Sequence, residues 1–162
     1  MRKAICDTSP LLYLHRLGAL EWLSVLFDEI WVPTAVVAEL REGKDKGYDV
    51  PDPVGYEWLR IMDPSALPSE WLARDLGRGE LAVLALALEN PSHLVVLDDA
   101  LARSIARAAG MQVWGTLRIL LEAKARGLTS SISPLLRTLE EAGMWISEDV
   151  RMRILAIAGE SD

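Results

Sequence analysis

Short apolar runs alternate along this chain with longer stretches in which apolar residues recur every three or four positions. The short runs predict strands at 3–6, 29–32, 60–62, 93–97 and 111–114, because each is brief and rich in branched or aromatic residues. The longer stretches have the period of amphipathic helices. Strands that alternate with helices are typical of βαβ units, so the pattern predicts an α/β protein with a mostly parallel five-stranded sheet.

Capping residues and glycines predict where the helices begin and end. Ser9 followed by Pro10 predicts an N-cap and first helical residue, for a helix that runs to 17. Pro33 predicts the start of a helix that continues to at least Leu40. Residues 43–53, with their glycines, prolines and mixed charges, predict a loop. Further helices are expected at 20–27, 56–59, 80–89, from 100 to Gly110, and at 117–126 before a capping Gly127.

The C-terminal part of the chain predicts two more amphipathic helices, at 132–139 and 146–158. At 162 residues the chain is expected to form a single domain, 1–162. Residues 128–162 would form a helical extension that packs on this domain or lies at a dimer interface. Both uses produce the same apolar stripe. We expect a homodimer.

Composition excludes several classes of protein. The longest apolar runs, such as 81–88, are far shorter than the roughly 20 residues of a membrane span. The basic start of the chain meets Asp7 too soon for a signal peptide, so we expect a cytoplasmic protein. The single Cys6 cannot form an internal disulfide and is expected to be a buried thiol. A net charge of −7 means that nucleic acid would need a local basic patch, bound metal ions or a basic partner.

Polar residues follow three of the predicted strands directly. Asp7 follows the first strand, Asp98 the fourth, and Thr116 the fifth after one glycine. In open parallel sheets, ligand sites form beyond the carboxyl ends of the strands, where the strand order reverses. If the order reverses between the first and fourth strands, Asp7 and Asp98 become close neighbours.

Each acidic residue also has a purely structural interpretation. Asp7 could cap the first helix, although Ser9 and Pro10 offer a better start. Asp98 or Asp99 could cap the next helix, but only one of them can fill that position. Glu80 could simply complement the positive end of its helix. Glu39, which lies among valines and alanines, could sit at the edge of an apolar stripe. These alternatives stay open for single residues.

Taken together, the acids favour a metal site. Several carboxylates brought together repel one another and raise each other's pKa unless a cation neutralises them. Oxygen ligands without histidine or cysteine suit hard cations such as Mg²⁺ and Mn²⁺. Such an ion polarises a phosphoryl oxygen and lowers the pKa of water, so phosphodiester hydrolysis is the best-matched reaction.

Other catalytic motifs are absent from the sequence. It contains no dinucleotide-binding glycine motif after a strand, no P-loop lysine motif and no nucleophile elbow. The only histidines, His15 and His93, lie in unrelated elements and are expected to be structural. A covalent aspartyl mechanism at Asp7 is disfavoured, since Ser9 stands where a second acid is usual.

Five segments, in order, resemble the PIN-domain family, specifically the VapC-like ribonucleases and their relatives. The resemblance covers roughly residues 3–127, and although each segment alone is weakly specific, the set is strongly so. The segments read ICDTSPL at 5–11, VPTAVVAEL at 32–40, GELAVLALA at 79–87, VLDDALAR at 96–103 and GTLRILLEAK at 115–124.

The resemblance implies a three-layer α/β/α sandwich with strand order 3-2-1-4-5. It also implies a site for Mg²⁺ or Mn²⁺ formed by four acids and a hydrolysis that leaves a 5′-phosphate and a 3′-hydroxyl. Thr116 matches a family Ser/Thr that positions water or phosphate, and Asp99 is an accessory candidate. The chain departs from the family at Ala100, where many relatives carry an acid. The implied metal ligands are Asp7, Glu39, Glu80 and Asp98, and the catalytic set adds Asp99 and Thr116.

We therefore predict a divalent-metal-dependent endoribonuclease that acts on RNA. Thr8, Ser9, Arg103 and Arg118 are the candidate substrate-binding residues, although the arginines could equally form an ordinary solvated helix face. Family likeness also suggests the toxin of a toxin–antitoxin pair, with an antitoxin protein as partner. The alternative is a catalytically weak or inactive PIN-fold module that binds nucleic acid or protein.

Overall fold

Five strands form one sheet in the order β3-β2-β1-β4-β5, and every neighbouring pair is parallel. The computed structural model describes residues 2–72 and 74–161; Met1 and Asp162, at the ends of the expected domain, and Ala73 lie outside the described residues. The parallel sheet and its strand order confirm the predicted fold class and the predicted order 3-2-1-4-5. The strands are β1 (Lys3–Cys6), β2 (Glu29–Val32), β3 (Leu59–Ile61), β4 (Leu94–Val96) and β5 (Val113–Trp114).

The register of the central strands aligns their carboxyl ends. Cys6 of β1 pairs with Val96 of β4, and Val96 pairs with Trp114 of β5. The residues that follow these strands therefore emerge at one edge of the sheet, which we call the carboxyl edge. Because the strand order reverses between β1 and β4, this edge is where an α/β sheet places a ligand site.

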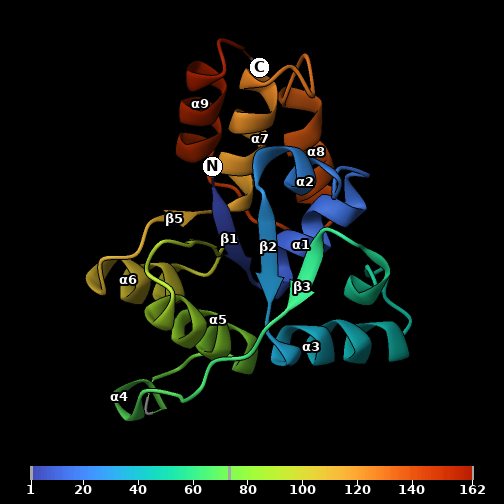
Figure 1. Cartoon of the computed structure of the whole chain (residues 1–162). Helices are drawn as coiled ribbons and strands as arrows, with labels where there is room; N and C mark the ends of the chain where they lie inside the picture. Colours follow the sequence, from blue (N-terminus) through green and yellow to red (C-terminus); the bar gives the residue numbers. More distant parts are fainter. Residues whose placement is uncertain (1, 73, 162) are drawn as a thin grey trace.

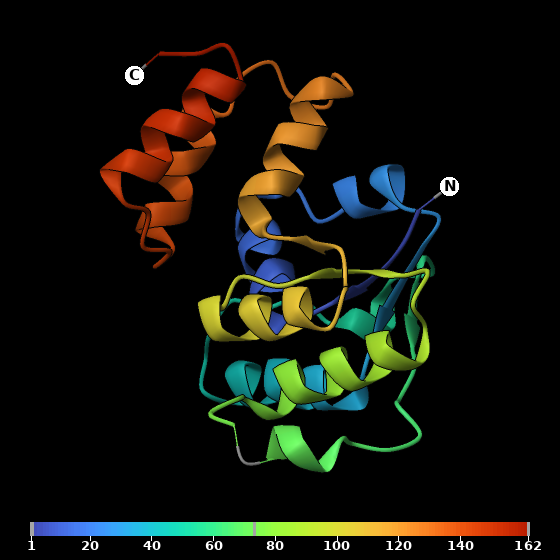
Figure 2. The same cartoon turned by 90° about the vertical axis from the view of Figure 1, so that its left-hand side faces the viewer.

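Helices connect the strands and flank both sides of the sheet (Figures 1 and 2). In Figure 1, α3, α5 and α6 lie around the carboxyl edge, whereas α7, α8 and α9 lie beyond the opposite end of β1 and β2. The helices are α1 (Thr8–Arg16), α2 (Trp22–Leu26), α3 (Thr34–Asp45), the 3₁₀ helix η1 (Pro53–Gly55), α4 (Ser69–Leu72), α5 (Arg78–Glu89), α6 (Ala100–Ala108), α7 (Thr116–Ala125), α8 (Ser133–Glu141) and α9 (Glu148–Ile157).

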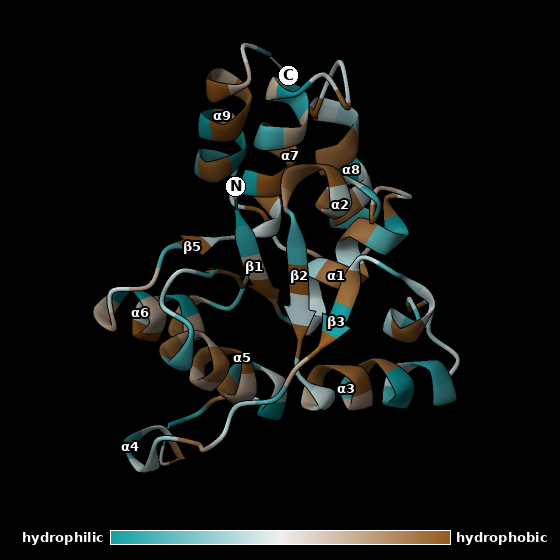
Figure 3. Ribbon diagram, in the orientation of Figure 1, coloured by the Kyte–Doolittle hydropathy of each residue, from teal (hydrophilic) through white to brown (hydrophobic). Residues whose placement is uncertain are grey.

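The hydrophobic core lies between the sheet and its helices. Strand β4 is buried along its whole length, and α5 packs against both β1 and β4. Figure 3 shows α5 as hydrophobic over most of its length, whereas α3 becomes hydrophilic toward its carboxyl end. Helix α5 therefore packs against the sheet, α3 and α6, and its first turn lies at the carboxyl edge beside Asp7.

Several local expectations are corrected by the structure. Helix α1 begins at Thr8 and not after Ser9, because Asp7 leaves β1 in an extended conformation and Pro10 fits within a first helical turn. Helix α3 continues through Asp45 into the predicted loop. The predicted helix at 56–59 is wrong: η1 precedes it, and Leu59 already belongs to β3. The short helix α4 was not predicted.

The C-terminal helices α8 and α9 follow α7, and α9 packs against it. The described residues contain no helix that combines the length and the apolar character needed to cross a membrane. The single cysteine, Cys6, is buried in β1, as expected.

Candidate active site

Asp7 lies at the carboxyl edge of the sheet, directly after β1. Its backbone amide donates to the carbonyl of Val96 at 3.1 Å, which continues the pairing between β1 and β4. Asp7 occupies the N-cap position of α1, but its side chain makes no capping hydrogen bond. The carboxyl group is therefore left for another role, although the predicted reason, a cap at Ser9, was wrong.

The carboxyl groups of Asp7 and Glu39 meet at the first turn of α5. One oxygen of each, Asp7 Oδ1 and Glu39 Oε1, is buried and has no hydrogen-bond partner among the described residues. A β-carbon built on Gly79 would overlap Glu39 Oε1 and would lie 3.2 Å from Asp7 Oδ1. Residues from β1, α3 and α5 are thus brought together, as the sequence predicted. Buried polar atoms without a partner are costly, so this convergence calls for a ligand.

The surroundings of Asp7 favour its protonated form. Burial raises its pKa from 3.8 to about 7, and the negative charges of Glu80, Glu39 and Asp98 add to that effect, against the lowering by the Thr8 amide. Only 5% of Asp7 is exposed to solvent. A cation would reverse this effect, because a nearby positive charge stabilises the ionised carboxylate.

The surroundings of Glu39 and Glu80 also favour the protonated form. Burial raises the pKa of Glu39, while the Gly79 amide and the charge of Arg78 act against that rise. Burial raises the pKa of Glu80 to about 7, and Asp99 and Glu39 contribute to the increase. The charge of Glu39 thus acts on both Asp7 and Glu80, which places these three acids in one anionic group, whereas the acid that raises the pKa of Glu39 itself is Glu42.

Asp98 is held by Thr116 at the start of α7. The Thr116 amide donates to Asp98 Oδ1 at 2.8 Å, and the hydroxyl donates to Oδ2 at 2.7 Å. Burial raises the pKa of Asp98, while these two hydrogen bonds and the charge of Arg103 lower it. The guanidinium of Arg103 lies against Gly115, next to Asp98. Asp98, Thr116 and Arg103 are therefore in contact or nearly so.

Asp99 has a structural role that the sequence left open. Its side chain caps α6 by accepting a hydrogen bond from the amide of Ala102 at 3.0 Å. Of the two adjacent aspartates, Asp99 fills the cap, and Asp98 is left to face the sheet edge. Asp99 still acts on the site electrostatically, through its effect on the pKa of Glu80.

The remaining predicted substrate-binding residues are distributed differently. Thr8 begins α1 beside Asp7, and its buried hydroxyl has no well-formed hydrogen bond among the described residues. It lies close enough to Glu39 to lower the pKa of that carboxyl group. Ser9 is half-buried in the first turn of α1. Arg118 is engaged elsewhere: it donates to Glu122 at 2.9 Å, and its guanidinium lies 4.8 Å from the centre of the Trp114 ring.

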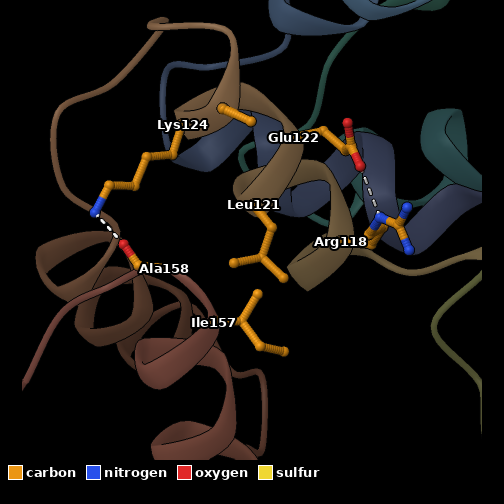
Figure 4. A pocket seen from close by; sticks show the side chains of 7 residues that line it. Arg118, Leu121, Glu122, Lys124, Ile157 and Ala158 are labelled. Carbon is orange, nitrogen blue, oxygen red and sulfur yellow. Dashed lines mark hydrogen bonds and ion pairs between the residues drawn. The ribbon is translucent and has the colours of Figure 1, made fainter.

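Arg118 also lines a groove between α7 and α9, whose volume is about 520 Å³ (Figure 4). Leu121 and Ile157 face each other across it, and none of the candidate acids contributes to its walls. The two histidines lie outside the acidic group as well: His15 is hydrogen-bonded to Asp49, and His93 stacks on Trp31.

Sequence reasoning missed two residues at the mouth of this site. Arg78 donates to Glu42 at 2.8 Å and thereby links α5 to α3 beside Glu39. Gly79 provides the space in which the acids meet. The only sequence signal was that Gly79 stands next to Glu80 in the matched segment 79–87 and that Arg78 directly precedes this segment.

The donor set fits a hard divalent cation by its chemistry. All the candidate ligands are carboxylates, and two buried oxygens lack partners. Within residues 2–72 and 74–161, however, no three His, Cys, Asp or Glu side chains are arranged so that they could hold a metal ion. Both oxygens of Asp98 point to Thr116, so its carboxylate would serve a cation while those bonds orient it.

The parallel sheet of order 3-2-1-4-5, with helices on both sides and acids at its carboxyl edge, defines a three-layer α/β protein. A family model, DUF3368, described as a PIN domain, matches residues 3–160. The chain belongs to the PIN-domain family, which confirms the resemblance in the five segments. PIN domains are generally nucleases, so the fold is of a nuclease type.

A solved structure is similar to this chain in fold. It is a PilT N-terminus domain protein from the hyperthermophilic archaeon Sulfolobus solfataricus, with a TM-score of 0.56 and 16% sequence identity. The match covers 75% of this chain and 92% of that protein. No curated protein matches the chain.

Proposed function

We propose that this protein is a divalent-metal-dependent endoribonuclease that hydrolyses RNA phosphodiester bonds. The observation that carries the proposal is the pair of buried oxygens without partners, Asp7 Oδ1 and Glu39 Oε1, inside a group of mutually repelling acids. Burial of carboxylates in this way is costly unless a cation compensates their charge.

Asp7, Glu39, Glu80 and Asp98 would hold Mg²⁺ or Mn²⁺ at the carboxyl edge. When bound, such an ion supplies Lewis-acid polarisation of the phosphate and a lowered pKa for water. Thr116 orients Asp98 through two hydrogen bonds and so fixes one side of the site. Arg103, whose guanidinium lies beside Asp98, would bind a phosphate of the RNA backbone and hold the scissile bond at the acids.

RNA cleavage by the purified protein tests this function. A labelled single-stranded RNA should be cut in the presence of Mn²⁺ and should remain intact in EDTA. Asp7→Asn and Asp98→Asn should abolish cleavage while the proteins stay folded by circular dichroism. Asp149→Asn, which changes an exposed aspartate paired with Arg153, is the matched control and should cleave normally. Cleavage that persists in Asp7→Asn would refute the proposal.

The alternative function is a PIN-fold module that binds nucleic acid or protein without cleaving it. It is favoured by the commitment of Asp99 to the α6 cap and of both Asp98 oxygens to Thr116, together with Ala100 in place of an acid. Isothermal titration with Mn²⁺ separates the two functions. A protein that binds no Mn²⁺ at millimolar concentrations would be such a module.

We also propose the physiological setting that family likeness suggests. The protein would act in the cytoplasm as a homodimer and as the toxin of a toxin–antitoxin pair. Light scattering tests the dimer, since a monomeric mass would exclude it. Co-expression with the product of a short neighbouring gene, followed by co-purification and loss of RNA cleavage, tests for the antitoxin.

A further inference from the structure

Two glycines of this chain stand out because a side chain would fit their backbone conformation but would collide with neighbouring atoms. All eleven glycines are among the described residues, and six of them have positive φ angles that side chains disfavour. Of the other five, a β-carbon would approach closer than 3.0 Å to another atom only at Gly79 and Gly115. In both cases the obstructing atoms belong to the candidate active site.

Gly79 is the more informative of the two. It lies in the first turn of α5, where alanine would favour the helix more than glycine does. It is buried, and a β-carbon there would overlap Glu39 Oε1 and crowd Asp7 Oδ1. Glycine at this position is therefore explained by the space that the two carboxylates occupy and not by the stability of the helix.

The same two oxygens are among the four buried side-chain atoms that lack a hydrogen-bond partner in the part of the chain that the structure describes. Asp7 cannot withdraw, because its backbone is held between β1 and α1 and only 5% of the residue is exposed. Glu39 has a longer and more flexible side chain, so it is the group that must move if position 79 gains a methyl group. The position of the Glu39 carboxylate relative to Asp7 thus depends on Gly79.

We propose that Gly79 is a positioning residue that seats Glu39 beside Asp7 and thereby sets the affinity of the site for a divalent cation. This inference rests on the proposed function, because it assumes that the acids bind such an ion. It adds that a residue with no side chain controls their geometry. Gly79 itself contributes no ligand.

Isothermal titration calorimetry of Mn²⁺ binding to the Gly79→Ala variant tests the proposal. We expect the affinity to fall about 10-fold or more, as is usual when a group that orients a metal ligand is altered. The melting temperature in EDTA should stay the same or rise, since alanine favours the helix. Gly55→Ala is the matched control, because a β-carbon there has no atom within 4 Å, and it should bind Mn²⁺ like the wild type.

A double variant distinguishes positioning from general damage. In the Glu39→Asp background the carboxylate is withdrawn by one methylene group, so the methyl group of Gly79→Ala no longer displaces it. The loss of Mn²⁺ affinity caused by Gly79→Ala should therefore be much smaller in that background than in the wild type. A structural defect would cost the same affinity in both backgrounds.

Three results would overturn the inference. These results are wild-type Mn²⁺ affinity in Gly79→Ala, the same loss of affinity in both backgrounds, and a melting temperature of Gly79→Ala well below that of the wild type in EDTA. In each case a wild-type protein that binds Mn²⁺ leaves the metal-dependent function standing. If the wild type binds no Mn²⁺, the proposed function fails as well, so the two failures are distinguishable.

Discussion

Asp98 accepts two hydrogen bonds from Thr116, one from the backbone amide at 2.8 Å and one from the hydroxyl at 2.7 Å. The two residues lie 18 positions apart in the sequence and follow neighbouring parallel strands, β4 and β5. Thr116 is fully buried. The pair fixes the direction of a carboxylate that burial would otherwise favour in its neutral form.

Thr116→Val should release one side of Asp98. Valine has nearly the shape of threonine but cannot donate, so Asp98 Oδ2 loses its partner. We expect a loss of about 1–3 kcal/mol in the free energy of unfolding, because a hydrogen bond to a buried charged group is removed. Urea denaturation measures this loss. Thr116→Ser keeps the hydroxyl and should retain most of the stability; an equal loss in both variants would contradict the explanation.

Stability without metal should fall as the pH rises. The pKa of Asp7 is about 7 in the folded protein against 3.8 as its ordinary value, so the folded state keeps a proton that the unfolded state releases between these values. Glu80, whose pKa is also raised to about 7, acts in the same direction. The melting temperature in EDTA should therefore be several degrees lower at pH 8 than at pH 5.

Two further melting experiments check whether titration of these acids causes the dependence on pH. Asp7→Asn should weaken the dependence on pH, because the asparagine does not titrate. Saturating Mn²⁺ should stabilise the protein most at pH 8, where the carboxylates are ionised. A melting temperature in EDTA that rises from pH 5 to pH 8 would contradict the prediction.

Arg103 and Arg118 should differ in their effect on RNA binding. Arg103 lies beside Asp98, whereas Arg118 is engaged with Glu122 and stacked on Trp114. Arg103→Gln should weaken RNA binding about 5- to 10-fold and lower the salt dependence by about one phosphate contact. Arg118→Gln should have a smaller effect. Fluorescence anisotropy with a short single-stranded RNA and the uncleaving Asp7→Asn protein measures both; equal losses would contradict the distinction.

The sequence predicted the elements of the sheet better than the details of the site. Strands β1 and β2 were predicted at their observed residues, because short buried runs leave little choice of boundary. The pattern alone did not give the strand order, which came from the family resemblance. The convergence of Asp7 with Glu39 also followed from that resemblance, since the two residues are 32 positions apart and belong to different elements.

Other features depended on three-dimensional contacts that local patterns do not encode. The capping rule could not choose between Asp98 and Asp99, because either fits before a helix. The hydrogen bond from the Ala102 amide to Asp99 and those from Thr116 to Asp98 decide it. Arg118 was a candidate for substrate binding or for a solvated helix face, because nothing in the sequence places it over Trp114. Gly79 was placed just before the helix predicted at 80–89, and only the structure shows that Glu39 and Asp7 lie against it.

Glu160 links the segment after α9 to the start of α8. Its carboxylate accepts hydrogen bonds from Lys124 Nζ at 2.7 Å, Ser131 Oγ at 2.7 Å, the Ile132 amide at 2.9 Å and the Ser133 amide at 3.1 Å. Partial burial acts to raise the pKa of Glu160, but these hydrogen bonds prevail and lower it to about 2.

Glu160→Gln should destabilise the protein by about 1–3 kcal/mol, because a charged acceptor of several hydrogen bonds becomes neutral. At about 2–4 °C per kcal/mol, the change is measurable by differential scanning calorimetry. Since the folded pKa lies below the ordinary value of 4.5, this stabilisation is complete above about pH 5 and declines as the pH falls toward 2. The difference in melting temperature between wild type and variant should therefore narrow in acid. Glu57→Gln, on an exposed turn, is the control and should match the wild type. If the difference in melting temperature between the wild type and Glu160→Gln stays constant down to pH 3, the charge of Glu160 is not its cause.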